Sequence, residues 1–134
     1  MSKPNFTGQW KLNLEKSRLQ IPTPASSLFV IEHREPTFRL TRTNVYGSEP
    51  NTISFEGTTD GAESEHDFGE VHARMRLYWD GDTLVADMHV RTKDDAGTNI
   101  VRYSLEDEGR MFRVVEQARS PKYRHDNLWI FDRA

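Results

Sequence analysis

Alternating apolar and polar residues on both sides of Asp80-Gly81 predict a long β-hairpin that spans Val71–Val90. A period of two places successive side chains on opposite faces of a sheet. Asp-Gly between two such runs is typical of a type I′ turn, because both turn residues need a positive φ. With this turn, Trp79 pairs with Asp82. The apolar pairs that follow are Leu77 with Leu84, Met75 with Ala86, Ala73 with Met88, and Val71 with Val90.

The same alternation recurs along the chain and predicts further strands. They are Gly8–Leu14, Ser27–Arg34, Thr37–Asn44, Thr52–Gly57, Asn99–Asp107, Met111–Ala118 and Asn127–Arg133. The segment Glu15–Ser26 contains Pro22 and Pro24 and has no helical period, so we interpret it as an irregular crossing loop. The segment Ala62–Gly69 is acidic and weakly patterned, and it is either a short edge strand or a mobile loop.

Turn residues indicate how the later strands pair. Pairing Lys93 with Thr98 across Asp94–Gly97 continues the apolar face of the hairpin. After Glu108-Gly109, a short loop pairs Val101 with Glu116 and keeps the even-numbered residues of the next strand inside. A bulged loop would instead turn Met111, Arg113 and Val115 inward. We prefer the first register.

These elements amount to nine or ten antiparallel strands without a helix. Regular spacing and consecutive hairpins predict an all-β, antiparallel up-and-down barrel, formed by one domain over residues 1–134. Only 35% of the residues are hydrophobic and the mean hydropathy is −0.78, which suits a sheet with one packed face and one wet face.

Charge and cysteine content narrow the classes of partner. The net charge of −3 comes from interspersed acidic and basic residues, so we expect neither nucleic acid nor a membrane as partner. The absence of cysteine excludes disulfides, thiolate catalysis and cysteine-ligated metals. No apolar signal core is visible near the first residue, so we expect a cytoplasmic protein, as a monomer or homodimer, with no cofactor.

Several motifs resemble those of small, mostly uncharacterised bacterial lipocalin-like proteins of the calycin type. They are Phe6–Ser17, Ile31–Pro36, Trp79–Val85, Tyr103–Gly109 and Phe131–Arg133. The resemblance covers most of the chain and consists of turns and core strands. It implies a barrel similar to lipocalins and fatty-acid-binding proteins, with an apolar pocket for a small hydrophobic ligand.

Gly8-x-Trp10 is similar to the first-strand signature of that superfamily, where an arginine from a late strand packs over the tryptophan. The resemblance makes Arg133 the candidate for this partner. Other family features are missing: the Thr-Asp-Tyr-type loop motif, a helix after the barrel, the two lid helices of fatty-acid-binding proteins and an Arg-x-Tyr carboxylate anchor on the final strand. Fatty-acid specificity therefore does not carry over to this chain.

The histidines give little evidence for a metal site. In the predicted register His72 lies opposite His89, close enough to share a metal, but two imidazoles with one nearby carboxylate rarely form a site. His66 and His125 add no ligand spacing. We expect a solvated exterior and no bound metal.

Four polar residues fall on the inner face of the predicted barrel: Arg42, Tyr103, Glu116 and His33. A buried charge must be paired or solvated. Either Arg42 and Glu116 neutralise each other or strand ends reach water, or these residues line a cavity mouth where Arg42 holds a ligand carboxylate and Tyr103 donates a hydrogen bond. The apolar walls would then be Phe29, Phe38, Phe55, Met75, Leu77, Met88 and Trp129, together with Trp10.

Three functions are compatible with this pattern. The first is binding of a small hydrophobic or amphipathic ligand without catalytic residues. The second is acid/base isomerisation or cyclisation, with Tyr103, Glu116 and His33 as proton-transfer groups. The third is protein contact through the outside of a packed barrel. A cavity of several hundred Å³ with converging polar groups favours the first two, and a filled interior excludes both.

Overall fold

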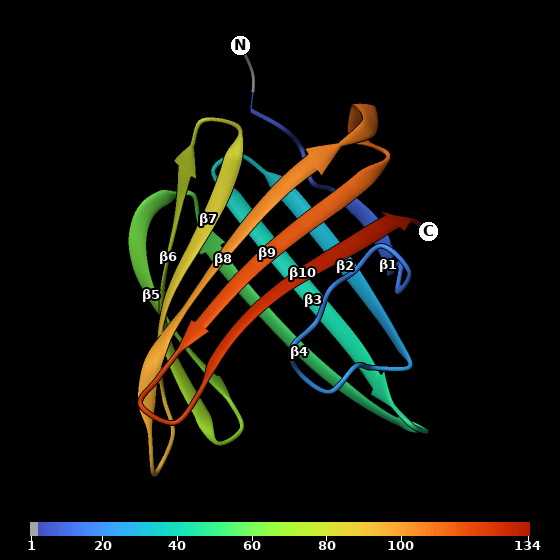
Figure 1. Ribbon diagram of the computed structural model, residues 1–134. Coiled ribbons are helices and arrows are strands. Elements are labelled where there is room, and N and C mark those ends of the chain that lie inside the picture. Colours follow the sequence, from blue (N-terminus) through green and yellow to red (C-terminus); the bar gives the residue numbers. More distant parts are fainter. Residues whose placement is uncertain (1–2) are drawn as a thin grey trace.

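The computed structural model describes residues 3–134, which form ten antiparallel strands in a single sheet (Figure 1). The strands are β1 (Gly8–Leu12), β2 (Ser26–Arg34), β3 (Thr37–Tyr46), β4 (Glu49–Thr58), β5 (Asp60–Phe68), β6 (Val71–Asp80), β7 (Thr83–Arg91), β8 (Ala96–Glu106), β9 (Met111–Arg119) and β10 (Arg124–Arg133). The order β4-β3-β2-β1-β10-β9-β8-β7-β6-β5 joins all neighbours by hydrogen bonds, and only β4 and β5 are not paired. The predicted up-and-down barrel is confirmed.

Helical structure within residues 3–134 is limited to one 3-10 turn, η1 (Asp107–Gly109). None of the described residues belongs to a helix long and apolar enough to span a bilayer. The segment between β1 and β2 contains no helix, as predicted. It lies along β10, where Arg18 forms an isolated bridge with Leu128 and Gln20 exchanges hydrogen bonds with Asp126 and Asn127.

The acidic segment that the sequence left open is a strand, β5, which pairs with β6 around a bulge between Asp60 and Glu63. Its acidic residues lie opposite basic ones: Glu63 pairs with Arg76 and Glu65 with Arg74. Weak hydrophobic patterning is tolerated here because the outward positions gain from cross-strand charge complementarity.

The central hairpin has the predicted faces but a different register. The turn is Gly81-Asp82, so Asp80 pairs with Thr83 and Trp79 with Leu84, and every predicted pair of this hairpin was wrong by two residues. Only Gly81 of the two turn residues has a positive φ, 62°, which suits a turn with glycine at its first central position. An even shift leaves each side chain on its predicted face.

At the next two turns, one predicted register is wrong and the other is confirmed. Between β7 and β8 the predicted pairing is wrong, and Arg91 pairs with Ala96. The turn has the predicted length of four residues but begins two residues earlier, because Thr92 and Asp95 close it through hydrogen bonds of 2.8 and 3.1 Å. Between β8 and β9 the preferred register is confirmed, and Val101 pairs with Glu116.

One end of the barrel is closed by Trp10, which is fully buried. The guanidinium carbon of Arg133 lies 4.2 Å from the centre of the Trp10 ring, and the indole nitrogen donates a hydrogen bond of 3.0 Å to the carbonyl of Phe6. A Cβ at Gly8 would lie 2.5 Å from a guanidinium nitrogen of Arg133. Glycine therefore leaves room for the cation, and the expected contact between Trp10 and Arg133 is confirmed.

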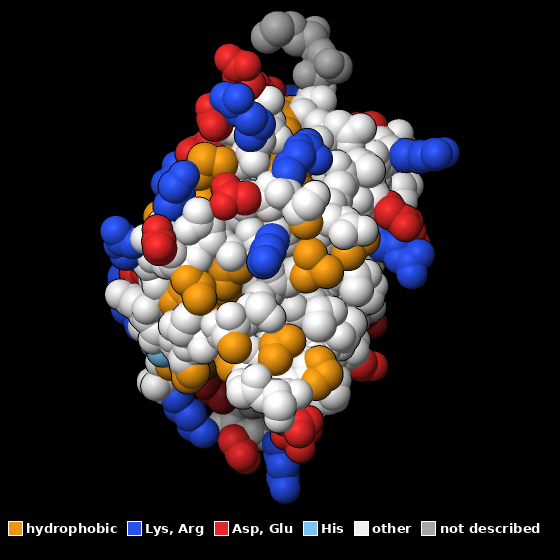
Figure 2. Space-filling model, turned by 90° about the vertical axis from the view of Figure 1, so that its right-hand side faces the viewer, with side chains coloured by type: hydrophobic (Ala, Val, Ile, Leu, Met, Phe, Trp, Pro, Cys, Tyr) orange, Lys and Arg blue, Asp and Glu red, His pale blue; other side chains and the backbone are white. Residues whose placement is uncertain are grey.

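The unpaired edge between β4 and β5 is filled by side chains. Gly57 lies inside β4 rather than at a turn, and a Cβ there would meet Leu77 at 3.0 Å and Met75 at 3.3 Å. The missing side chain lets these two residues of β6 approach β4, which closes the core where no ladder exists. On the outside, Figure 2 shows charges of both signs interspersed with hydrophobic side chains on the face that it presents.

Candidate functional site

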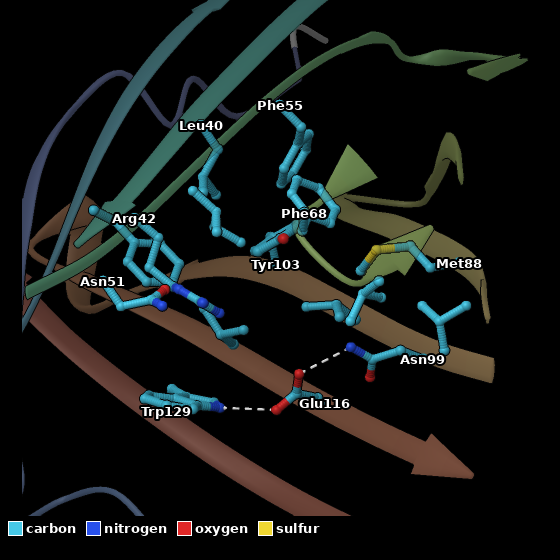
Figure 3. Close-up of a pocket in the computed structure, with 16 residues that line it drawn as sticks. Leu40, Arg42, Asn51, Phe55, Phe68, Met88, Asn99, Tyr103, Glu116 and Trp129 are labelled. Atoms are coloured by element: carbon cyan, nitrogen blue, oxygen red, sulfur yellow. Dashed lines mark hydrogen bonds between the residues drawn. The ribbon is translucent and has the colours of Figure 1, made fainter. Parts of the chain in front are cut away.

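A cavity of about 330 Å³ occupies the barrel interior at the end opposite Trp10 (Figure 3). Seven of the predicted site residues line it: Phe29, Arg42, Phe55, Met88, Tyr103, Glu116 and Trp129. The lining also includes Leu40, Asn51, Ile53, Phe68, Val71, Val90, Asn99, Val101 and Val114. Since one water takes up about 30 Å³ of liquid, the space corresponds to roughly eleven waters.

Glu116 lies at the centre of the polar part of the cavity. Its carboxylate accepts hydrogen bonds from the side-chain amides of Asn99 and Asn127, both at 3.0 Å, and from the indole nitrogen of Trp129 at 3.2 Å. Asn127 is itself held by the backbone N–H of Gln20, which donates to its amide oxygen at 2.7 Å. Three N–H donors hold the carboxylate in one orientation.

Arg42 projects into the same cavity from β3, where it pairs with Phe29 on one side and Ile53 on the other. Its Nε is buried and has no hydrogen-bond partner, and within residues 3–134 the guanidinium forms no ion pair with Glu116. Burial lowers the pKa of Arg42, and Glu116 counteracts this effect in part. Arginine stays charged in proteins even so, which leaves a cation facing the cavity with unused donors.

Tyr103 contributes a hydroxyl that has no hydrogen bond to any residue in the described part of the chain. Its ring stacks on Phe112 at 5.7 Å, with the rings 5° from parallel, and contacts Phe38 at 5.7 Å. Burial raises the pKa of Tyr103, and the charge of Glu116 adds to the effect. The phenol is therefore neutral near pH 7 and is available as a hydrogen-bond donor rather than as a base.

Four buried polar atoms of residues 3–134 lack a partner, and all belong to this half of the barrel. They are Nε of Arg42, Oδ1 of Asn99, Oδ1 of Asn44 and Oγ of Ser27. Asn44 lies two positions from Arg42 on β3 and pairs with Ser27 on β2. Unpaired buried polar groups cost free energy, so their concentration here marks a functional region rather than a stabilising one.

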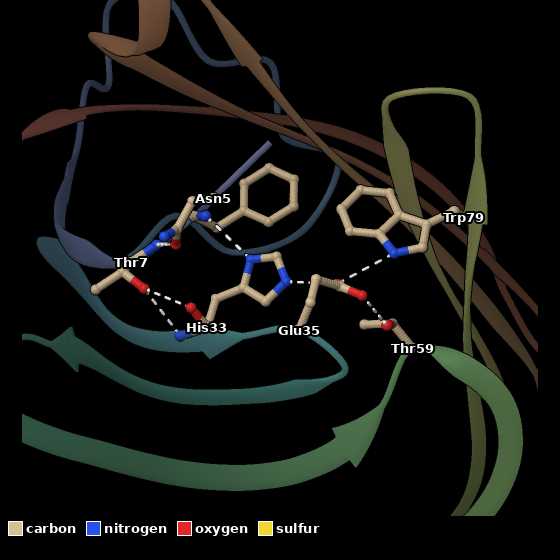
Figure 4. Close-up of polar contacts among 7 residues, drawn as sticks. Asn5, Thr7, His33, Glu35, Thr59 and Trp79 are labelled. Carbon is tan, nitrogen blue, oxygen red and sulfur yellow. Dashed lines mark hydrogen bonds and ion pairs between the residues drawn. The ribbon is translucent and has the colours of Figure 1, made fainter. Parts of the chain in front are cut away.

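His33, the fourth predicted polar site residue, lies at the closed end and not at the cavity (Figure 4). The backbone N–H of Phe6 donates to its Nδ1 at 3.2 Å, and its Nε2 donates to Glu35 at 2.7 Å. Thr59 and the indole nitrogen of Trp79 also donate to Glu35, at 2.7 and 3.1 Å. Every polar side-chain atom of this network is partnered.

Four predicted apolar wall residues are also absent from the cavity lining, and one of them, Trp10, closes the opposite end of the barrel. Phe38 lies beneath the cavity, packed between Phe6 and Tyr103, while Met75 and Leu77 fill the edge between β4 and β6. The alternation of side chains along each strand correctly placed all of these residues in the barrel interior. It did not state at which height along the barrel each would lie, because height depends on strand tilt and stagger.

Asn99, Phe68 and Val71 are lining residues that the sequence interpretation missed. Asn99 points inward like Val101 and Tyr103, because it lies an even number of residues from both on the same strand. The alternation in the sequence could therefore have identified it. Phe68 was left in an unassigned segment, and its role depends on the pairing of β5. Phe6, which precedes β1, is fully buried, although the alternating pattern did not place it in the core.

The predicted opposition of His72 and His89 is wrong, because His72 pairs with Arg91 and His89 with Arg74. Nδ1 of His72 instead donates a hydrogen bond of 2.7 Å to the carboxylate of Asp67. Within residues 3–134 no group of three histidine, aspartate or glutamate residues is arranged to hold a metal ion.

Solved structures with the same architecture exist at very low sequence identity. The chain is similar to zebrafish ileal bile acid-binding protein, in a crystal structure with cholic acid, with a TM-score of 0.67, 12% identity and coverage of 96% of this chain and 98% of that chain. It is also similar to secretory abundant heat soluble protein 4 of Ramazzottius varieornatus, with a TM-score of 0.64, 11% identity and coverage of 100% and 99%. No protein-family model and no curated protein matches the sequence. The likeness establishes a calycin-type barrel fold.

Proposed function

We propose that the barrel binds a small amphipathic ligand whose carboxylate is held by Arg42 and Tyr103. The observation that carries this proposal is the Arg42 guanidinium, which faces the cavity without a partner among the described residues. A carboxylate would satisfy those donors with charge-assisted hydrogen bonds. The Tyr103 hydroxyl, in the same cavity, supplies a further neutral donor.

The apolar walls suit the body of such a ligand. Leu40, Phe55, Phe68 and Met88 surround the space beside Arg42 and Tyr103 (Figure 3). A concave apolar pocket with a few convergent polar groups is typical of small-molecule sites. The bile acid-binding protein with a similar fold was crystallised with cholic acid, an amphipathic acid, which supports the same class of ligand for this chain.

The other two functions have less support. Proton transfer by Tyr103, Glu116 and His33 needs the three groups together, whereas His33 lies at the opposite end and the raised pKa of Tyr103 makes it a poor base near pH 7. A packed barrel for protein contact is at odds with a cavity of about 330 Å³. Membership of the small bacterial lipocalin-like group, and a cytoplasmic location, stay predictions.

Thermal melting with octanoic acid, dodecanoic acid and the matching alcohols tests the proposal. Saturation at about 100 times the Kd stabilises the folded protein by about 2.7 kcal/mol and raises its Tm by several degrees. We expect a saturable shift with the acids, a smaller one with the alcohols, and loss of the difference in Arg42→Gln. Arg39→Gln, an exposed neighbour on β3, is the matched control. Equal shifts in both variants, or none with any acid, would contradict the proposal.

A further inference from the structure

The cavity holds two opposite charges that do not contact each other. Arg42 enters from β3 and Glu116 from β9, on facing walls (Figure 3). Both side chains line the same cavity, and the charge of Glu116 favours the charged form of Arg42. A ligand that enters between them therefore meets a cation on one side and an anion on the other.

The environment of Glu116 has acceptor positions that no protein donor fills. An ionised carboxylate has about four lone-pair sites, and three N–H groups use three of them. Asn99 donates to Glu116 through its amide nitrogen, so its amide oxygen lies in the same region, buried and without a partner. A ligand donor placed beside Glu116 would fill the remaining acceptor position of the carboxylate.

A ligand with a carboxylate alone matches only half of this arrangement. It would satisfy Arg42, but it would bring a negative charge toward Glu116 and leave the fourth acceptor position of that carboxylate empty. Like charges in a partly desolvated site repel strongly. A ligand with an amine alone would pair with Glu116, but it would bring a positive charge toward Arg42 and leave the donors of Arg42 unused.

On the basis of the proposed function, we propose that the ligand is zwitterionic, with its carboxylate at Arg42 and Tyr103 and its ammonium at Glu116. The body is an alkyl or aromatic group of modest size, as a volume of about 330 Å³ requires. An α-amino acid with a long apolar side chain has this chemistry. Both charged groups of the site are then paired, and the net charge of the cavity does not change.

Calorimetric titration with α-aminooctanoic acid, octanoic acid and octylamine at neutral pH tests the inference. The three probes share one carbon chain and differ only in their charged groups. We expect the amino acid to bind at least about tenfold more tightly than either single-charge probe, since each satisfied charge pair contributes about 1.4 kcal/mol or more.

Variants locate the effect within the site. Glu116→Gln should weaken the amino acid about tenfold without weakening octanoic acid, while Arg42→Gln should weaken both acids and spare octylamine. Glu56→Gln, an exposed carboxylate on β4, is the control and should change nothing. If Glu116→Gln does not fold, the order of the three probes on the wild-type protein decides.

The outcomes separate the two proposals. Octanoic acid that binds as tightly as the amino acid would overturn the zwitterion inference and leave the proposed function in place. Failure of both acids to bind would overturn both. An amino-acid preference that survives Glu116→Gln would also overturn the inference, because the ammonium would then lie elsewhere.

Discussion

The two ends of the barrel differ in whether their polar side chains have hydrogen-bond partners. At the closed end His33, Glu35, Thr59 and Trp79 satisfy one another and the backbone of Phe6. At the cavity end Arg42 and three other buried polar atoms have no partner in the described chain. A fully satisfied network rigidifies a core, whereas unsatisfied groups cost stability. The comparison shows which end is built for stability and which for a ligand.

The largest expected difference between the two ends concerns aromatic truncation. Phe6 is fully buried between His33, Trp79 and Phe112, so Phe6→Ala should lower the free energy of unfolding by about 3–5 kcal/mol. In Phe55→Ala the space left by the ring joins an existing cavity instead of opening a new one among packed side chains, so the loss should be only about 1.5–3 kcal/mol. Urea denaturation of both variants measures the difference. Equal losses would mean that the cavity end is packed as tightly as the closed end.

Removal of the Arg42 cation should stabilise the protein, in contrast to the two aromatic truncations. We expect Arg42→Met to raise the free energy of unfolding by about 1–2 kcal/mol, because Glu116 keeps its three N–H donors while an unpaired, half-buried charge disappears. The same variant should lose octanoic acid binding. Arg39→Met, on the exposed side of β3, should change stability by less than about 0.5 kcal/mol. A destabilised Arg42→Met protein would show that Arg42 serves the fold.

Tyr103→Phe tests whether the cavity phenol serves the ligand or the fold. Its hydroxyl has no protein partner, so stability should change by less than about 0.5 kcal/mol. Binding of octanoic acid should weaken about tenfold through loss of a hydrogen bond to a charged group. Denaturation and calorimetry on one preparation give both numbers. A large loss of stability with unchanged affinity would place the hydroxyl in the structural network instead.

The smallest effect concerns acid stability at the closed end. Burial opposes ionisation of Glu35, but hydrogen bonds from His33, Thr59 and Trp79 outweigh it, so the pKa lies below the ordinary value of 4.5. The stabilisation is therefore complete above about pH 4.5 and is lost as pH falls through the lower folded pKa. Urea unfolding between about pH 3 and 6 should show a shallower acid decline in Glu35→Gln than in wild type. Glu56→Gln should keep the wild-type slope.

Local pattern determined more of the fold than of the site. Alternation and turn residues placed nearly every strand and assigned Arg42, Tyr103 and Glu116 to the interior, because a period of two is a local property of the backbone. The register between strands was harder to predict than the faces. The predicted register of the central hairpin was wrong by two residues. The turn selects which residues pair, and an even shift leaves the alternating pattern unchanged, so the pattern does not detect the error.

What the sequence alone determined is therefore the barrel class, the inner and outer faces, and the contact of Trp10 with Arg133 that the motif resemblance implied. Only the tertiary structure decided that His33 and Arg42, both inward, lie at opposite ends, one satisfied and one free. It also decided that Asn99 and Asn127 hold Glu116. The physical reason is that height within a barrel follows from strand tilt and stagger, which are set by closure of the whole sheet and by no single segment.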